Sequence, residues 1–251
     1  MAKQKKRQSL RKVLLFVFLL LFPVVLNFLS PYVSLQGAID GFISGSLLFF
    51  GVLFFTALFA GRVFCGWVCP GGGLQEACFF INDRRTDNKK LDWIKYLIWV
   101  PWFGTIVVFL VLSFSRLQLN LLYLTENGIS VDEPGKYIIY YFVTGLIFIF
   151  SVLIGRRAMC HSICWIAPFM VIARDIRNLV KWPSLILKAD RSRCTDCQLC
   201  TKNCVMSLDV HKMVESGKID SSGCILCGQC ADSCPQQVIR YSFSRGLPKK
   251  M

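Results

Sequence analysis

Four stretches of the chain carry no Asp, Glu, Lys or Arg over a length that can cross a lipid bilayer. They run from Val13 to Ile39, Gly41 to Gly61, Tyr96 to Ser115, and Tyr137 to Gly155. A helix of about 20 apolar residues covers the hydrocarbon core, and a backbone in lipid must satisfy its own hydrogen bonds. Each stretch therefore predicts a membrane-spanning helix. The first is longer than required and contains Pro23 and Asn27, so we expect a kink or an interfacial tail there.

Composition agrees with membrane spans. Of the 251 residues, 54% are apolar and only 18% are charged, whereas about a quarter of the residues are charged in an average soluble domain. The chain has 13 cysteines, and an odd number argues against a simple set of disulfide pairs. These values exclude a disordered protein, a secreted disulfide scaffold and an ordinary cytosolic enzyme.

Basic residues flank the predicted spans on one side. Six Lys and Arg lie in the leader 1–12, others follow the second span, and Arg156 and Arg157 follow the fourth. The two remaining loops carry only Arg116 and Lys136, beside the acidic residues Asp40, Glu126, Asp132 and Glu133. The positive-inside rule predicts a multi-pass protein of the cytoplasmic (inner) membrane, with both termini and all cysteines on the cytoplasmic side. We interpret the leader as a topology signal beside a retained anchor, and expect lipid but no nucleic acid as its partner.

Eight cysteines near the C-terminus form two runs of the same spacing, Cys-x2-Cys-x2-Cys-x3-Cys. The first run is Cys194, Cys197, Cys200 and Cys204, and the second is Cys224, Cys227, Cys230 and Cys234. In this spacing three thiolates hold one [4Fe-4S] cluster and the fourth ligates the other cluster. We therefore predict one cluster on Cys194, Cys197, Cys200 and Cys234, and a second on Cys224, Cys227, Cys230 and Cys204. Zinc sites normally use two separated pairs, and disulfides are disfavoured in a reducing cytoplasm.

Two further cysteine pairs follow the second and fourth predicted spans. Cys65 and Cys69 form one Cys-x3-Cys pair, Cys160 and Cys164 form the other, and a Gly-Arg precedes each. The membrane part thus reads as two tandem halves of about 95 residues, a parallel repeat whose axis lies along the membrane normal. Spacing i, i+4 predicts both thiols of a pair on one helical face. Four thiolates meeting at the cytoplasmic face could hold a further iron–sulfur or metal centre; a redox dithiol and structural thiols are the alternatives.

Several residues near these motifs are interpreted as structural and not as ligands. We read Cys78 as a buried thiol, with an extra ligand as the alternative, and Gly71 to Gly73 as a flexible turn. His161 is expected beside the membrane-edge site without being a ligand, and His211 is expected to have no partner. The segment from Pro168 to Trp182 is amphipathic and predicts an interfacial helix.

The motifs together resemble a known family of membrane-bound polyferredoxins. The run Cys65-Gly66-Trp67-Val68-Cys69-Pro70 with Leu74-Gln75-Glu76 is similar to its first motif. In the second motif Trp165 takes the place of the usual proline, and Pro168 follows three residues later. The family includes the membrane iron–sulfur subunit of periplasmic nitrate reductase systems and the membrane half of the nitrous oxide reductase regulator. The resemblance implies electron transfer between a membrane quinol, menaquinol or ubiquinol, and protein partners.

The predicted fold is an α-helical membrane domain over residues 13–188, with four transmembrane helices in two tandem pairs. A C-terminal α+β two-cluster bacterial-type ferredoxin domain follows over residues 189–242, and a basic tail over 243–251. The predicted function is relay of single electrons between a quinol pool or membrane partner and a cytoplasmic protein partner, as a subunit of an oxidoreductase system. The alternatives are a membrane thiol/disulfide reductant using the Cys-x3-Cys pairs, and a redox-sensing regulatory or maturation factor for another metalloenzyme.

Overall fold

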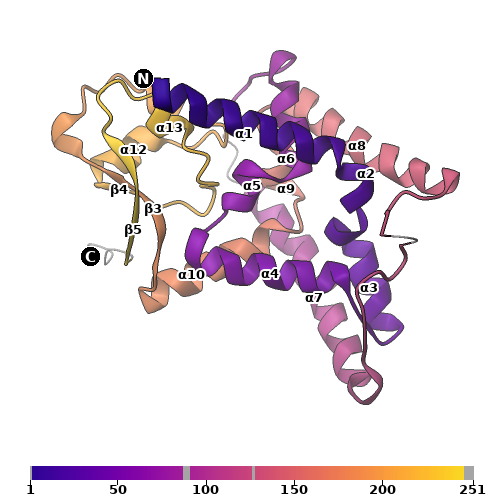
Figure 1. Cartoon of the computed structure of the whole chain (residues 1–251). Helices are drawn as coiled ribbons and strands as arrows, with labels where there is room; N and C mark the ends of the chain where they lie inside the picture. Colours follow the sequence, from indigo (N-terminus) through magenta and orange to yellow (C-terminus); the bar gives the residue numbers. More distant parts are fainter. Residues whose placement is uncertain (1, 87–90, 126–127, 246–251) are drawn as a thin grey trace.

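The computed structural model describes residues 2–86, 91–125 and 128–245 of the chain. Lys89, Lys90 and Glu126, which carry part of the charge argument, and residues 246–251 of the predicted tail lie outside these residues. A helical part makes up most of the molecule, and the cysteine-rich C-terminal part lies at one end of it, next to the start of the first helix (Figure 1).

The first half of the helical part is more broken than its apolar pattern predicts. Its elements are α1 (Ala2–Leu20), α2 (Phe22–Val25), η1 (Asn27–Leu29), α3 (Pro31–Ile39), β1 (Phe42–Ser44), α4 (Gly45–Ala60), α5 (Val63–Trp67), α6 (Pro70–Ala77) and η2 (Cys78–Phe80). The expectation of one helix over Val13 to Ile39 is wrong, because Ser30 caps a new helix that begins at Pro31, and the Asn27 side chain bonds the Leu124 carbonyl. The expected kink does lie in this stretch.

The second half repeats this order with longer helices. It consists of α7 (Leu91–Leu112), η3 (Phe114–Arg116), β2 (Gln118–Asn120), α8 (Pro134–Ile154), α9 (Ala158–Ser162) and α10 (Ala167–Val180). Strands β1 and β2 pair in parallel and join the two halves, with Phe42 opposite Gln118. This pairing explains why the helix in the second apolar stretch begins only at Gly45.

The two halves pack in the same way. Helix α6 lies against α1 of its own half and α8 of the other, while α10 lies against α7 of its own half and α4 of the other. The short helices follow this rule, since α5 contacts α1 and α9 contacts α7. Phe169 of α10 stacks on Phe50 of α4 with ring centroids 5.3 Å apart, and its ring edges meet Trp99 and Trp102 of α7. In each half, the helix that follows the cysteine pair thus also packs against a long helix of the other half, as the tandem repeat in the sequence suggests.

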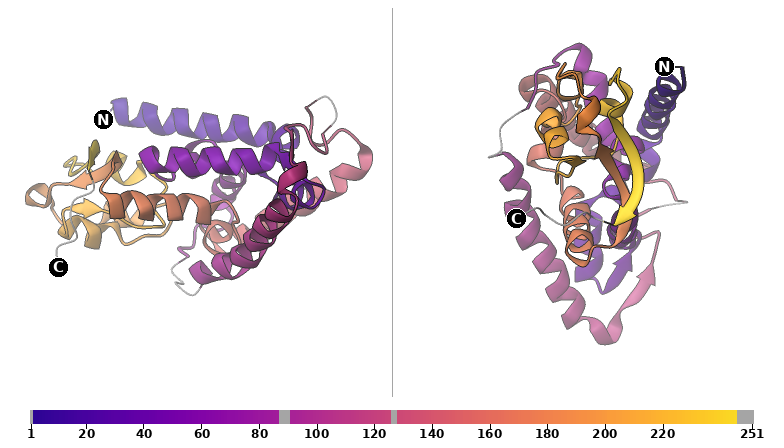
Figure 2. Two further views of the ribbon diagram at one scale, coloured as in Figure 1. Left: turned by 90° about the horizontal axis from the view of Figure 1, so that it is seen from below. Right: turned by 90° about the vertical axis from the view of Figure 1, so that its left-hand side faces the viewer.

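Two of the described helices are long and apolar enough to cross a membrane, namely Asp92–Leu112 in α7 and Pro134–Ile154. Only 11% of the residues in each apolar window are buried inside the protein, so neither is the core helix of a soluble domain. Helix α4 is apolar but has only 16 residues. Figure 2 shows the axes of α1 and α4 roughly aligned; α1 begins at the cysteine-rich end and α4 ends there, so the two helices run in opposite directions.

The C-terminal part is a small α+β unit. Strands β3 (Pro183–Ala189), β4 (Lys218–Ile219) and β5 (Ile239–Arg245) form an antiparallel sheet in the order β4-β3-β5, with Pro183 opposite Arg245 and Ala189 opposite Ile239. The short elements η4 (Arg191–Arg193), α11 (Leu199–Lys202), α12 (Val210–Glu215) and α13 (Gln229–Asp232) lie between the strands.

This unit packs directly on the helical part through its second cysteine run. Trp67 of α5 donates its indole N–H to the Leu226 carbonyl at 3.1 Å, and Gln8 of α1 donates to the Cys227 carbonyl at 3.1 Å. Gly66 permits this contact, because a Cβ atom there would lie 2.4 Å from the Ile225 carbonyl oxygen. The second run is therefore fixed against the membrane-edge motif.

We predict that Gly66→Ala loosens this interface. The added methyl group meets rigid backbone, and such overpacking costs about 1–3 kcal/mol. Thermal unfolding in detergent, together with limited proteolysis of the 181–190 segment, measures the effect. Gly51→Ala in α4 is the matched control, because nothing lies within 4 Å of its Cβ position. Equal stability of the two variants would contradict the direct backbone contact.

Candidate metal centres

The two cysteine runs fold in the same backbone register. Left-handed residues occur at Asp196, Gln198 and Ser207 after the first run begins, and 30 residues later at Leu226, Gly228 and Gln237. Five of these six are not glycine, and each pays a strain cost that the surrounding structure must offset. Alternating conformations of this kind turn successive backbone N–H groups toward one concavity, a geometry found at iron–sulfur sites.

The first three cysteines of each run line one cavity together with the last cysteine of the other run. One cavity is lined by Cys194, Cys197, Cys200 and Cys234, and the other by Cys204, Cys224, Cys227 and Cys230. The two cavities are of equal size, about 20 Å³ each. These are the two sets of four that the spacing predicts, and four thiol donors at each cavity fit a [4Fe-4S] cluster. Ligation by these thiols stays a prediction.

The two cavities differ in exposure. Residues 195–199 of the first loop, including Cys197, are exposed, whereas residues 225–228 of the second loop are buried. Burial raises the pKa of Cys224 to about 11 and that of Cys227 to about 12. Thiols with such pKa values bind as thiolates only when a cation compensates the charge.

The membrane-edge cysteines lie on two turns of matching geometry. Cys69 donates its backbone N–H to the Phe64 carbonyl at 3.1 Å, and Cys164 donates to the equivalent Met159 carbonyl at 3.1 Å. Cys65 lies in α5 and Cys69 follows it, in extended conformation at the start of α6. The expectation that one helix face carries each pair is therefore wrong, since α5 and α9 end between the two cysteines. In the second motif α10 begins at Ala167, two residues beyond Trp165, with Pro168 in its first turn.

The four thiols converge at the interface between the halves. Burial, together with the charges of Cys160 and Cys65, raises the pKa of Cys164 to about 12. Burial also raises the pKa of Cys69, on which all three other thiols act. Gln75 of α6 donates to the Cys160 sulfur at 3.2 Å, so one half orients a thiol of the other.

Two buried arginines flank these thiols, and sequence reasoning missed their role. Arg62 and Arg157 each stand three residues before the first cysteine of their motif, and both are fully buried. Arg62 lies 3.9 Å from the Cys65 sulfur, and Arg157 donates to the Cys65 carbonyl at 2.9 Å. Their common spacing to the cysteines is the signal in the sequence, whereas the positive-inside rule assigns both arginines only a topology role.

Glu76 joins this site to the leader. Its carboxylate accepts two hydrogen bonds from Arg11, at 2.8 and 2.9 Å, and also forms an ion pair with Arg157. Burial alone would raise the pKa of Glu76, but Arg157 and Arg11 outweigh it and hold the pKa below its usual range. Gly72 makes room for this network, because a Cβ there would lie 2.1 Å from Arg157 Nη1. The three glycines are therefore part of α6, and the expected flexible turn is wrong.

Three neighbouring residues have clear positions. Cys78 is buried and hydrogen-bonded to the Ser151 side chain, and none of the four paired thiols contributes to its pKa. His161 is buried beside the site, with Nδ1 3.0 Å from Asp92 Oδ1. His211 has a partner, contrary to expectation: its Nε2 lies 2.8 Å from Asp196 Oδ1, close to the Cys194 sulfur.

We predict that Glu76→Gln destabilises the fold by about 3–5 kcal/mol, because it leaves two buried guanidinium groups without a counter-charge. The ionised Glu76 stabilises the native state above its unfolded-state pKa, and this contribution is lost as the pH falls through its lowered native pKa. Thermal unfolding in detergent at neutral pH measures the loss.

Asp83→Asn is the matched control. Asp83 pairs with Arg156 but is 55% exposed, and exposed pairs contribute about 0–1 kcal/mol. Equal losses in the two variants would show that the Glu76 network is no stronger than a surface pair.

Comparison with known proteins identifies the chemistry. A family model described as a 4Fe-4S binding domain matches residues 43–86 and again residues 138–183, so it includes both Cys-x3-Cys pairs. A model described as a 4Fe-4S dicluster domain matches residues 193–239. No solved structure matches the chain significantly.

The relatives extend over most of the chain. An uncharacterized protein of Methanocaldococcus jannaschii is 26% identical over 98% of this chain and 92% of its own length. The ferredoxin-type protein NapH of Haemophilus influenzae is 29% identical over 78% of this chain and 65% of its own length. The regulatory protein NosR of Pseudomonas aeruginosa is 30% identical over 70% of this chain, which matches only 25% of NosR. The chain is thus an iron–sulfur protein and belongs to a family of membrane polyferredoxins related to NapH and NosR.

Proposed function

We propose that the chain is a membrane-anchored iron–sulfur protein that relays single electrons between a quinol pool or membrane partner and a cytoplasmic protein partner. The observation that carries this proposal is the serial arrangement of three thiol sites. The four membrane-edge thiols adjoin the cavity of Cys204, Cys224, Cys227 and Cys230, and the cavity of Cys194, Cys197, Cys200 and Cys234 follows. Iron–sulfur clusters bound there would supply one-electron chemistry.

The contacts of the second cysteine run support this order. Arg62, which flanks the edge thiols, donates to the Ser222 carbonyl at 2.9 Å, and its charge also acts on Cys224. Residues 225–228 are shielded on the inner side, whereas Cys197 is exposed. The inner cavity thus adjoins the edge site, and the outer cavity presents its loop to solvent, where a protein partner could dock.

The membrane position rests on the exposed apolar helices. In α7 and α8 most large apolar side chains face outward, among them Leu97, Val111, Phe142 and Leu153. Soluble surfaces rarely carry apolar patches of this size. We propose that α7 and α8 span the bilayer, that α1 and α4 complete four spans, and that the basic ends place both termini and all cysteines in the cytoplasm.

A cleft beside the inner cavity suits an amphipathic electron donor such as menaquinol or ubiquinol. It measures about 480 Å³ and lies between α1 and α6. Its apolar wall consists of Leu15, Phe16, Leu19, Phe79 and Phe80. Glu76 lines its polar side, and Val205 and Gln229, neighbours of Cys204 and Cys230, also line it. A quinol bound in this cleft would contact the apolar wall with its tail and the polar side with its ring, close to the inner metal site.

The geometry disfavours the thiol-reductant alternative. Cys65 and Cys160 are buried, and burial raises the pKa of Cys65, whereas exchanging dithiols need accessible thiolates. Nothing in the part of the chain that the structure describes favours the regulatory alternative over electron transfer.

Iron content tests the proposed centres. We expect about twelve iron atoms per anaerobically purified chain if the edge thiols hold a third [4Fe-4S] cluster. Cys65→Ser/Cys69→Ser should lower the count to about eight, while the control Cys78→Ser leaves it unchanged. If the wild type contains about eight iron atoms and the double variant contains the same number, the chain has no third centre. If the double variant keeps that number but loses activity, dithiol chemistry is favoured.

Filling the cleft tests the donor site. Ala77 lines it and is exposed, so Ala77→Trp should lower kcat/KM for a quinol analogue at least about tenfold, equivalent to about 1.4 kcal/mol, without loss of iron. Leu97→Trp on the outward face of α7 is the control. An unchanged kcat/KM in Ala77→Trp would place the donor elsewhere.

A further inference from the structure

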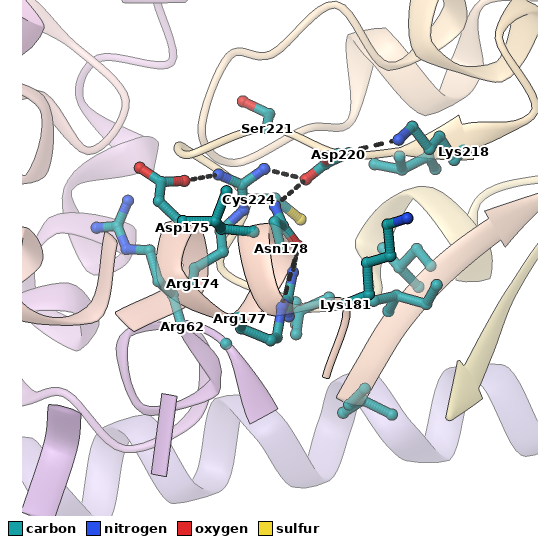
Figure 3. A pocket seen from close by; sticks show the side chains of 17 residues that line it. Arg62, Arg174, Asp175, Arg177, Asn178, Lys181, Lys218, Asp220, Ser221 and Cys224 are labelled. Atoms are coloured by element: carbon teal, nitrogen blue, oxygen red, sulfur yellow. Dashed lines mark hydrogen bonds and ion pairs between the residues drawn. The ribbon is translucent and has the colours of Figure 1, made fainter. Parts of the chain in front are cut away.

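One cavity has no role in the electron path proposed above. It measures about 670 Å³ and lies between α10, strands β3 and β4, and the loop that carries Cys224. Figure 3 shows its side chains, which come from both the helical part and the C-terminal unit.

Positive charge dominates the lining of this cavity. Five cations line it, namely Arg62, Arg174, Arg177, Lys181 and Lys218, against the two carboxylates of Asp175 and Asp220. Both carboxylates are already paired: Arg174 binds Asp175 at 2.7 Å and also Asp220, and Lys218 lies 3.8 Å from Asp220. The lining therefore carries an excess of three positive charges.

Arg177 is one of the two buried cations of this lining, beside Arg62. Its side chain is only 5% exposed, and it donates hydrogen bonds from Nε at 3.2 Å and from Nη2 at 2.8 Å to the neutral Asn178 Oδ1 (Figure 3). Burial and the nearby Arg174 lower the pKa of Arg177 from its ordinary value, which is unusual for an arginine. A buried guanidinium in this state gains free energy when an anion binds beside it.

Lys181 supplies a second cation. It ends α10 in a left-handed conformation, and Figure 3 shows its ammonium group reaching into the cavity, away from the dashed bonds of its neighbours. The guanidinium fork and the ammonium group together match the oxygens of a phosphate group.

The rim of the cavity is apolar. Leu179 is 83% exposed, and Val180 and Trp182 beside it are also exposed. Trp182 meets Phe59 at the end of α4 edge-on, with ring centroids 5.8 Å apart. Exposed leucine and tryptophan side chains beside basic groups are typical of segments that lie in the membrane interface.

We propose that this cavity binds a phosphate group, and that at the membrane the ligand is the head group of an anionic phospholipid, whose chains lie along the rim of Leu179, Val180 and Trp182. Cys224 lines the same cavity, so the bound anion acts on the inner metal site. This last consequence rests on the proposed function, whereas lipid binding does not.

The test uses the full iron-loaded chain in nanodiscs of phosphatidylcholine, with or without phosphatidylglycerol. Native mass spectrometry of the released protein should show phosphatidylglycerol retained over phosphatidylcholine by about tenfold. Arg177→Gln/Lys181→Gln should abolish this preference, and Arg177→Lys should largely keep it. Lys6→Gln/Lys212→Gln, which removes the same charge from exposed residues that do not line the cavity, is the control. Equal iron content shows that each variant is folded.

Two further measurements follow: competition with inorganic phosphate identifies which part of the lipid is recognised, and the midpoint potential tests the effect on the inner metal site. If millimolar inorganic phosphate competes with phosphatidylglycerol, the cavity recognises the phosphate group itself; if it does not, the acyl chains are required, and both results keep the proposal. The midpoint potential of the inner site should fall in phosphatidylglycerol for the wild type but not for the double variant, because a nearby anion disfavours added negative charge. Equal lipid retention by the double variant and the control would overturn the proposal, whatever the iron count or the activity.

Discussion

The rest of the structure depends on how buried positive charge is balanced at the interface between the two halves. Arg62 and Arg157 are fully buried beside four thiols, and Glu76 is the carboxylate that Arg157 shares with Arg11. Leaving such a charge unpaired costs several kcal/mol, so each group requires the others. The same residues connect the leader helix, both Cys-x3-Cys turns and, through Arg62, the C-terminal unit. One electrostatic network thus sets where the metal-binding parts lie relative to the apolar helices.

The repeat explains why this network forms. Helix α6 packs between α1 of its own half and α8 of the other, and α10 packs between α7 of its own half and α4 of the other, so both turns lie at the interface between the halves. The C-terminal unit repeats in its backbone as well, but it is used asymmetrically. Its second loop is buried against Gly66 and Trp67, while its first loop is exposed. A symmetric pair of cysteine runs therefore becomes an inner and an outer site, as a relay between membrane and solvent requires.

Spacing alone predicts the two sets of four cysteines, because three thiols at two-residue gaps enclose one site and leave the fourth for the other; the same sets line the two cavities, while ligation stays a prediction. The apolar pattern also located α7 and α8, since uninterrupted apolar runs permit few structures. It failed over Val13 to Ile39, where the cap at Ser30 and the bond from Asn27 to Leu124 divide the helix. The helical face assumed for each Cys-x3-Cys pair failed because α5 and α9 end before the second cysteine. The Glu76 network and the partner of His211 depend on tertiary contacts, which no local pattern encodes.

The central claim is that the membrane-edge thiols hold a redox centre next to the inner cavity. An anaerobic EPR redox titration of the wild type and of Cys65→Ser/Cys69→Ser tests it most directly. The account predicts that signals of the reduced wild type are broadened by coupling to a third centre, and that the double variant loses one signal and this broadening while the signals of the C-terminal unit remain. Superimposable spectra of the two proteins would contradict it.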